Sequence, residues 1–287
     1  MISQPATAPA LFIGHGSPMN TLETNGFTES WSDLGRVLPR PRAILVISAH
    51  WFIGATAVTA MPRPRTIHDF YGFPPELFAY DYPAPGAPNL AQEVADVVKP
   101  YWVGLDYDQW GLDHGTWSVL AHMYPEADIP VVQLSINALK PLAYHVDLGL
   151  KLAALRKSGV MILASGNVVH NLQLVRWNRP DAAFDWNLRF DETVATQLAE
   201  DPVSILRVTD HPDYAKSVPT PDHFIPLLYT AGLAAASEGR ADAIVRGYAM
   251  GSLSMTCYGI GTEKFCPTKA EGAATLPVRV PADQSNI

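Results

Sequence analysis

An α/β fold is predicted for this sequence, as a single domain over residues 1–287. It should have a mainly parallel central sheet, helices on both faces and the active site at the carboxyl edge of the sheet. Two observations and one general rule lead to this prediction. Apolar segments of strand length alternate with segments of helix length, as in parallel sheets. Three of the apolar segments run into a histidine. In open α/β sheets, ligands bind outside the carboxyl ends of the strands.

The predicted strands are short segments rich in aliphatic residues, at 9–14, 42–48, 130–136, 160–165, 242–249 and 252–258. The last alternates polar and apolar residues, which predicts an antiparallel edge strand. Helices are predicted at 28–38, 88–99, 115–123, 143–157, 187–199 and 224–236. The helix at 143–157 is largely apolar and stops at Ser158-Gly159. The core is expected to span about 9–260, and the extension 268–287, which has little periodicity, to wrap the surface or fray.

Composition restricts the class of protein. Hydrophobic residues make up 48% and charged residues 17% of the 287 residues, which is typical of a globular chain with a substantial core. The net charge of −8 disfavours a nucleic-acid partner, because domains that bind nucleic acid usually carry a basic patch. No apolar run is long enough for a membrane helix, and the N-terminus lacks the basic start of a secretory signal. With only two cysteines, we expect no disulfide framework and a cytoplasmic location. We expect the chain to be a monomer or a small homo-oligomer.

Three histidines that follow strand-like segments predict a metal site. His15, His50 and His170 each come after an apolar run, with Gly, Ser or Ala close before them. Parallel strands deliver such residues to one edge of the sheet, where the imidazoles can converge. Neutral imidazole is the commonest protein ligand for metals, and small neighbours let the backbone approach a bound ion.

Two further histidines have a comparable setting. His114 follows Asp113 at a predicted helix start, where the carboxylate can cap the helix or orient the ring. His223 follows Asp222 ahead of an apolar helix. Five histidines exceed the needs of one metal, so we expect some of them to be catalytic. His122 and His145 are expected on a helix surface or in the core, and His211 in a turn. The role of His68, which lies in an aromatic loop, is undecided.

Residues 61–88 do not fit a plain pattern of strands and helices. This proline-rich segment follows the second predicted strand, and long loops without secondary structure are uncommon unless functional. We expect it to cover the site; the alternative is a surface loop docked on the core. Its aromatic side chains include Phe70, Tyr71 and Phe73. Arg63 and Arg65 are the cations nearest to the expected pocket, where they either meet a substrate carboxylate or stay solvated.

Several familiar catalytic motifs are absent. The chain has no His-Glu-x-x-His, no glycine-rich phosphate loop and no Gly-x-Ser-x-Gly elbow. Their absence disfavours zincin proteases, P-loop enzymes and α/β-hydrolases. Ligands drawn from distant parts of the chain instead suit a site assembled on a sheet edge, and imidazole ligands with open positions suit Fe(II) or Zn(II).

Seven short motifs occur in order between about residues 9 and 260. They are Gly14-His15-Gly16-Ser17-Pro18, Ser48-Ala49-His50-Trp51, Thr66-Ile67-His68-Asp69-Phe70-Tyr71-Gly72-Phe73-Pro74, Tyr82-Pro83-Ala84-Pro85-Gly86, Leu112-Asp113-His114-Gly115-Thr116-Trp117, Ser165-Gly166-Asn167-Val168-Val169-His170-Asn171 and Pro221-Asp222-His223-Phe224-Ile225-Pro226-Leu227. Together they resemble the DOPA 4,5-extradiol dioxygenase family, which belongs to the class III extradiol ring-cleaving dioxygenases and is related to protocatechuate 4,5-dioxygenase. The motifs are specific for the family and say little about the substrate.

The resemblance implies a non-haem Fe(II) enzyme that opens a catechol ring with O2, beside its two hydroxyls rather than between them. In the wider class two histidines and a glutamate hold the metal. His15 and His50 match the histidines, the chain shows no matching glutamate, and His223 takes the third position. His170 then serves as the base or as a further ligand, and His114 as a hydrogen-bonding acid, with the two catalytic roles open to exchange. The resemblance places His68, Phe70, Tyr71 and Phe73 against the aromatic substrate. A histidine-rich shell can also retain Zn(II) on purification.

Two other functions remain open at this stage. A zinc-dependent hydrolase on the same scaffold would need a carboxylate as general base beside the metal-bound water, and Asp113 and Asp222 are the candidates within the motifs. A catalytically silent metal-binding protein would close its site with four ligands.

Overall fold

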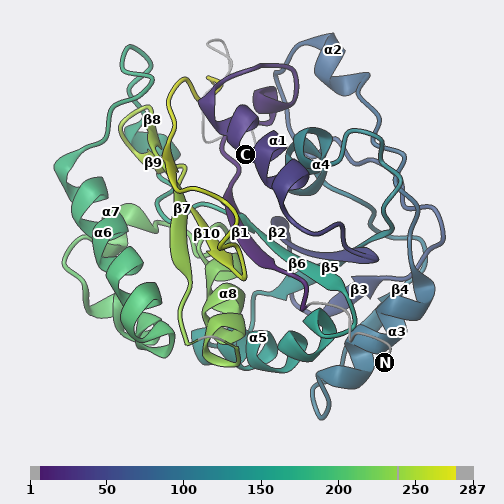
Figure 1. Cartoon of the computed structure of the whole chain (residues 1–287). Helices are drawn as coiled ribbons and strands as arrows, with labels where there is room; N and C mark the ends of the chain where they lie inside the picture. Colours follow the sequence, from purple (N-terminus) through teal and green to yellow (C-terminus); the bar gives the residue numbers. More distant parts are fainter. Residues whose placement is uncertain (1–6, 238, 276–287) are drawn as a thin grey trace.

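A nine-stranded sheet runs through the computed structural model, which describes residues 7–237 and 239–275 (Figure 1). Its strands are β1 (Ala10–Gly14), β2 (Ala43–Ile53), β3 (Ala57–Thr59), β4 (Gly104–Asp106), β5 (Val131–Asn137), β6 (Val160–Gly166), β7 (Asp242–Arg246), β10 (Cys257–Ile260) and β11 (Thr268–Lys269). Their order across the sheet is β11-β7-β10-β1-β6-β2-β5-β3-β4. Two short strands, β8 (Tyr248–Ala249) and β9 (Leu253–Ser254), pair in a separate small sheet.

The centre of the sheet is parallel, as predicted. β1 pairs with β6, β6 with β2, and β2 with β5, all in the same direction, so their carboxyl ends lie along one edge. β10 runs antiparallel between β1 and β7. The prediction of an antiparallel edge strand at 252–258 is therefore right in direction and wrong in place, and this segment divides into β9 and β10. The predicted strand at 242–249 also divides, at Gly247, into β7 and β8.

All six predicted helices are present, within a few residues of their expected ends. The helices are η1 (Pro18–Thr21), α1 (Gly26–Val37), α2 (Pro75–Phe78), α3 (Pro88–Val97), α4 (His114–Met123), α5 (Leu142–Arg156), η2 (Leu172–Leu174), α6 (Asp185–Glu200), η3 (Pro202–Asp210), α7 (Tyr214–Ser217) and α8 (Ile225–Ala235). The five not predicted are mostly single turns; η3 is the longest of them. One, α2, lies inside the aromatic loop 61–88.

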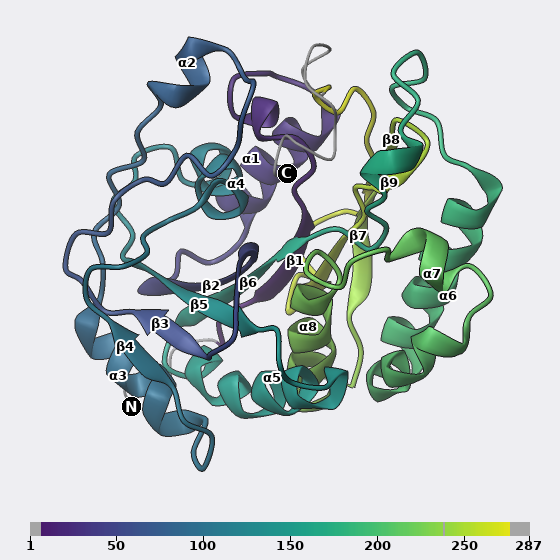
Figure 2. The same ribbon diagram turned by 180° about the vertical axis from the view of Figure 1, so that it is seen from behind.

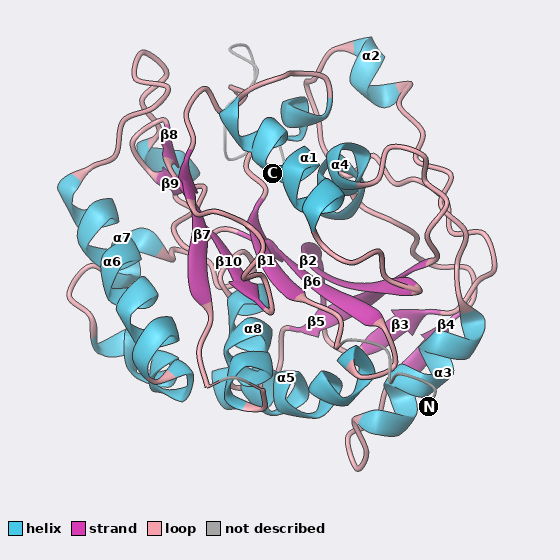
Figure 3. Ribbon diagram, viewed as in Figure 1, coloured by secondary structure: helices cyan, strands magenta, loops and turns pink. Residues whose placement is uncertain are grey.

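Helices cover both faces of the sheet, because both faces of the parallel strands are apolar. Side chains alternate between the faces along a strand. On β2, Leu45 and Ile47 pack in one core cluster with residues of α3, α5 and α8, whereas Ile44 and Val46 pack in another with residues of α1 and α4. The two layers are visible on opposite sides of the sheet (Figure 3) and again from behind (Figure 2). The predicted fold class is confirmed.

The described part of the C-terminal extension packs against the protein. β11 pairs with β7, and Ala270, Ala273 and Ala274 are buried. The remainder of the predicted extension, 276–287, lies outside the described residues. Cys257 is buried and Cys266 is exposed, and neither is in a disulfide. Within the described ranges, no helix has the length and apolar character needed to cross a membrane.

Candidate metal centre

β1, β2 and the segment that follows β6 bring three histidines to the carboxyl edge of the sheet. Only in β1 does the strand end directly before its histidine. His15 follows β1 directly, and its backbone N–H donates to the Gly166 carbonyl at the end of β6. His50 lies inside β2, which continues to Ile53. The pairing of β2 with β5 shifts register between Ile47 and Phe52, so His50 sits at an irregularity that the sequence does not reveal. His170 lies four residues beyond the end of β6, where its backbone N–H donates to the Ser217 carbonyl.

Two glycines allow further elements to approach these strands closely. α4 begins at His114, and the Asp113 side chain caps it by accepting from the Thr116 N–H, as predicted. A Cβ at Gly115 would lie 2.5 Å from Ser48 Oγ and 2.9 Å from His50 Cδ2. A Cβ at Gly166 would collide with the carbonyl oxygen of His223, which precedes α8. Each glycine therefore makes room for one of the two additional histidines.

The five predicted histidines form one cluster. The ring centroids of His15, His50 and His223 lie 5.1 Å (His15–His50), 5.4 Å (His15–His223) and 5.0 Å (His50–His223) apart. The ring of His114 lies 3.8 Å from that of His50 and 5.8 Å from that of His15. His170 stacks on His223 with the centroids 3.6 Å apart and the planes 4° from parallel. Residues that are up to about two hundred positions apart in the chain thus meet at one edge.

Hydrogen bonding determines which nitrogen of His15 faces the cluster. Ser165 Oγ donates its only hydrogen to the Gly115 carbonyl, at 2.5 Å. His15 Nδ1 lies 2.9 Å from the same oxygen and must therefore be the donor of that contact. Since a neutral imidazole carries one hydrogen, Nε2 of His15 is left as a lone-pair atom, and it lies 3.2 Å from Nε2 of His50.

Carboxylates contact Nδ1 of the other three closely spaced histidines. Asp222 Oδ2 lies 2.5 Å from His223 Nδ1. Asp69 Oδ1 lies 3.0 Å from His114 Nδ1, and Asp69 Oδ2 lies 3.4 Å from His50 Nδ1. Such contacts orient a ligating imidazole and leave its Nε2 for the metal. Asp69 and Ser165 are residues whose roles the sequence did not reveal; the only signal was their place inside the motifs around His68 and His170.

Burial favours the uncharged form of three of these histidines, His15, His50 and His170. Burial lowers the pKa of His15 and of His50 well below the ordinary range, and the neighbouring histidines lower both further. Burial, followed by the proximity of His223, also lowers the pKa of His170. Burial alone would raise the pKa of Asp222, but the charge and hydrogen bond of His223 outweigh it and the pKa falls. Neutral imidazoles are the form that binds a metal.

The donor set fits a divalent transition metal. Donor nitrogens of His15, His50 and His114 all lie within 4.8 Å of one another. Two imidazole nitrogens bound tetrahedrally at about 2.0–2.1 Å lie about 3.3–3.4 Å apart, close to the 3.2 Å between Nε2 of His15 and Nε2 of His50. Among the described residues, Nε2 of His114 and Nε2 of His223 are buried without a hydrogen-bond partner, a costly arrangement that a metal or substrate would relieve.

The aromatic loop reaches the cluster through Asp69 and Phe70. The ring of Phe70 is buried and its centroid lies 5.5 Å from that of His114. Phe73 is buried behind it, with ring centroids 5.1 Å apart. Tyr71, in contrast, is 66% exposed. Nε2 of His68 donates to the Tyr80 carbonyl at 2.9 Å, so this ring is held within the loop.

The two loop arginines lie on the surface. Arg63 and Arg65 are both exposed. The guanidinium of Arg65 donates to the backbone carbonyl of Gln109 at 2.5 Å and so helps to hold the loop.

A buried polar network supports the cluster from behind. Asp113 Oδ1 accepts from Ser48 Oγ at 2.7 Å, and Ser48 Oγ in turn accepts from the backbone N–H of His50 at 3.3 Å. Trp110 Nε1 and the side-chain amide of Gln133 donate to the other oxygen of Asp113. Burial raises the pKa of Asp113 to about 6, with the charge of Asp69 adding to the effect. Because its oxygens are already engaged, Asp113 acts as a structural support for β2 and α4.

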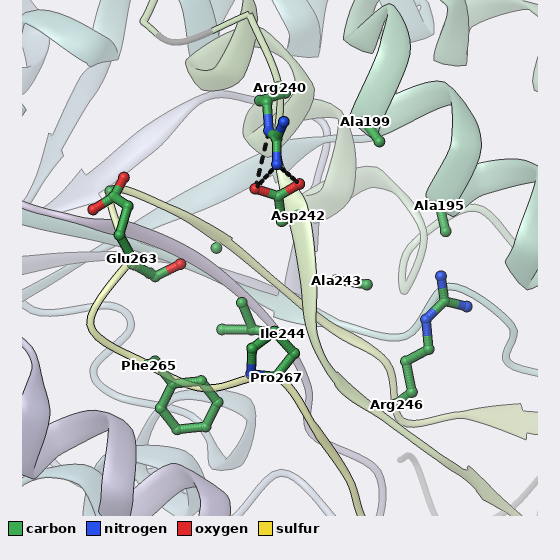
Figure 4. Close-up of a pocket in the computed structure, with 13 residues that line it drawn as sticks. Ala195, Ala199, Arg240, Asp242, Ala243, Ile244, Arg246, Glu263, Phe265 and Pro267 are labelled. Atoms are coloured by element: carbon green, nitrogen blue, oxygen red, sulfur yellow. Dashed lines mark hydrogen bonds and ion pairs between the residues drawn. The ribbon is translucent and has the colours of Figure 1, made fainter.

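A cavity lies away from the histidines, beside β7 (Figure 4). Its volume is about 480 Å³, and Arg240 and Asp242 on its wall pair with each other. The described residues that line it include no histidine.

An α/β scaffold with a histidine cluster at the carboxyl edge of a parallel sheet defines a metal-dependent enzyme of the non-haem type. Residues 9–262 match the family described as the catalytic LigB subunit of aromatic ring-opening dioxygenase, and the chain belongs to this family. The predicted resemblance and the predicted class of enzyme, an extradiol ring-opening dioxygenase, are confirmed.

Relatives and a solved structure agree with this assignment. A 4,5-DOPA dioxygenase extradiol of Escherichia coli (strain K12) is 52% identical over 259 residues, which cover 88% of this chain and 94% of that protein. A protein of the same name from Beta vulgaris is 36% identical over 260 residues, covering 86% of this chain and 94% of that protein. The crystal structure of an uncharacterised protein from Escherichia coli K12 superposes with a TM-score of 0.77 at 48% identity, over 88% of this chain and 100% of that chain. The hydrolase alternative finds no support in these relatives.

Proposed function

We propose that the chain is a single catalytic domain that opens the ring of a DOPA-like catechol with O2, at Fe(II) held by His15, His50 and His223. The observation that carries the proposal is the convergence of these three buried imidazoles, each with its Nδ1 against a polar side chain and its Nε2 available. The substrate class is supported by the names of the relatives, which include 4,5-DOPA dioxygenases from a bacterium and from plants.

The donor nitrogens that lie within 4.8 Å of one another belong to His15, His50 and His114, but the arrangement of the ring centroids supports His223 as the third ligand. The three centroid separations of 5.1, 5.4 and 5.0 Å make a nearly equilateral triangle. The centre of such a triangle lies about 3 Å from each ring, close to the distance expected for a metal bound through one imidazole nitrogen. His114 instead lies only 3.8 Å from His50 and off this triangle. It is therefore proposed as a catalytic group beside the metal.

When bound, Fe(II) supplies the redox chemistry that lets O2 react with a catechol. The chain supplies the rest. A catechol must lose protons to chelate a metal, and His170, neutral and stacked on His223, is proposed as the base. Nε2 of His114 is buried and directed away from Asp69, which suits hydrogen bonding to the bound reactants and return of a proton. The reverse division of these two roles, and a ligand role for His170, are outcomes of the tests below.

The loop 61–88 is proposed to enclose the aromatic ring and exclude water. Phe70 supports this proposal because its ring lies against His114. Phe73 packs against the ring of Phe70. His68, held within the loop by the Tyr80 carbonyl, and the exposed Tyr71 complete the proposed substrate-binding set. Arg63 and Arg65 are the proposed partners of a substrate carboxylate, and their exposure leaves them accessible from solvent.

The test is anaerobic reconstitution of the chain with Fe(II) or with Zn(II), followed by measurement of oxygen uptake with DOPA and with an uncharged 4-alkylcatechol. We expect catechol-dependent oxygen uptake with Fe(II) and none with Zn(II), although Zn(II) binds. Arg63→Ala and Arg65→Ala should raise the KM for DOPA alone if either arginine binds the carboxylate. Turnover of no catechol by the Fe(II)-loaded chain would refute the proposed function.

A further inference from the structure

One side chain of the aromatic loop contacts two histidines of the cluster at once. Asp69 accepts from both the backbone N–H and Nδ1 of His114 with one oxygen, each at 3.0 Å. Its other oxygen lies 3.4 Å from Nδ1 of His50. Its side chain is 9% exposed, so water competes little for these contacts. A single carboxylate is thus shared between a proposed metal ligand and a proposed catalytic group.

The hydrogen bond specifies the tautomer of His114, because a carboxylate only accepts and Nδ1 must therefore carry the hydrogen. The 3.4 Å contact between the other oxygen and Nδ1 of His50 favours the same form in that ring. Nε2 of each ring is then the lone-pair atom that faces the cluster. Without the carboxylate, neither ring has a fixed tautomer, because Nδ1–H and Nε2–H forms of imidazole have similar energies in water. Their rings lie only 3.8 Å apart, so a change in one ring disturbs the other.

We propose that Asp69 is a positioning residue that holds His50 and His114 together in the Nδ1–H form and so aligns a metal ligand with a catalytic group. The inference rests on the proposed function for the roles of the two histidines. It adds a link between the aromatic loop and the metal centre, because Asp69 directly precedes Phe70, whose ring lies against His114. A movement of the loop around a bound substrate would then be transmitted to both imidazoles.

The same loop offers a matched control. Asp81 accepts a hydrogen bond from Thr66 Oγ1 at 2.6 Å and lies on the surface. Asp69→Asn and Asp81→Asn therefore make the same chemical change in one loop, and only the first affects the histidines. Asparagine keeps one acceptor oxygen for the His114 backbone and replaces the other with an amide nitrogen, which cannot accept from His50.

The experiment compares full-length wild type, Asp69→Asn and Asp81→Asn, each carrying isotope-labelled histidine. The spectra are recorded on metal-free samples, because a metal bound at Nε2 would by itself fix the hydrogen on Nδ1. Nuclear magnetic resonance reports the tautomer of each ring, and competition with a chelator reports Zn(II) affinity. In wild type and Asp81→Asn we expect Nδ1–H signals from His50 and His114. In Asp69→Asn we expect at least one of these signals to be lost, with those of His15 and His223 retained, and Zn(II) affinity to fall about 10- to 100-fold.

The outcomes separate this inference from the proposed ligand set. Unchanged signals of His50 and His114 in Asp69→Asn would overturn the positioning role, and so would equal losses in Asp81→Asn. Loss of the His50 signal with unchanged Zn(II) affinity would support the positioning role and refute His50 as a metal ligand. The Fe(II)-loaded variants give an independent measure: we expect Asp69→Asn to lower kcat more than it changes KM, since Asp69 contacts the histidines and not the proposed substrate.

Discussion

Ser165 offers the sharpest single substitution at the proposed metal centre. Its hydroxyl donates to the Gly115 carbonyl at 2.5 Å and accepts from Nδ1 of His15 at 2.9 Å. Ser165→Ala removes both contacts without adding bulk. His15 then loses the acceptor that holds its hydrogen on Nδ1 and its Nε2 toward the cluster. We expect the affinity for Zn(II) to fall about 10- to 100-fold, the usual cost of removing the partner of a ligating histidine.

That loss corresponds to about 1.4–2.7 kcal/mol of binding free energy. Stability should fall as well, because the buried carbonyl of Gly115 is left without this donor, at a cost of about 1–3 kcal/mol. Ser135 is a matched control. It is also a fully buried strand serine with two hydrogen bonds, accepting from the Ala57 N–H and donating to the Ala55 carbonyl. Ser135→Ala should therefore lose stability but keep the metal affinity of wild type.

The assay is chelator competition for Zn(II), with the free energy of unfolding measured by urea denaturation of the same metal-free samples. The reasoning predicts that the two variants are similarly destabilised and that only Ser165→Ala binds metal more weakly. Zn(II) affinity of Ser165→Ala within twofold of wild type would refute the assigned role of this hydroxyl. Equal weakening in Ser135→Ala would show that general destabilisation, and not the orientation of His15, sets the affinity.

Two further predictions concern other histidines. His170→Gln should lower the turnover of the Fe(II)-loaded enzyme by about 10²–10⁴-fold, as expected for loss of a general base, while Zn(II) affinity is largely retained; complete loss of metal would move His170 into the ligand set. His145, buried between α5 and α8, has its pKa lowered to about 4 by burial, against a raising effect of the Lys140 carbonyl. In the unfolded chain His145 takes up a proton below about pH 6.5, whereas in the folded protein it stays neutral down to about pH 4. Its contribution to the stability of the folded state is therefore present above about pH 6.5 and is lost as the pH falls. Between pH 8 and pH 5 the unfolding free energy of wild type should therefore drop about 2 kcal/mol more than that of His145→Gln. The same dependence of unfolding free energy on pH in both proteins would contradict the lowered pKa of His145.

The sequence predicts those parts of the fold that have a continuous apolar pattern. β5 and β6 were predictable because every residue in them is buried and aliphatic residues predominate in both. β3, β4 and β11 have two or three residues each, too few for a periodic pattern. The position of β10 inside the sheet was not predictable, because the alternation of polar and apolar residues at 252–256 precedes this strand and β10 itself has only four residues.

The histidines of the site were predictable because their small neighbours are unusual. Gly115 and Gly166 are required because other elements approach them closely, so the site is visible in the sequence as glycines beside histidines. The sequence contains no comparable signal for the roles of Asp69 and Ser165. A carboxylate in a proline-rich loop is indistinguishable from a surface charge until the loop is folded over His114. The role of Ser165 depends on the parallel register that pairs β6 with β1, and a register is a property of two strands together.

The central claim is that His15, His50 and His223 hold the metal while His114 stands beside it. The most direct measurement is the Zn(II) content and affinity of His223→Ala against His114→Ala, each prepared from the full-length chain and checked for native circular dichroism. The account predicts that His223→Ala loses nearly all bound metal and that His114→Ala retains one equivalent with near wild-type affinity. The opposite result, metal retained in His223→Ala and lost in His114→Ala, would contradict it and make His15, His50 and His114 the ligand set.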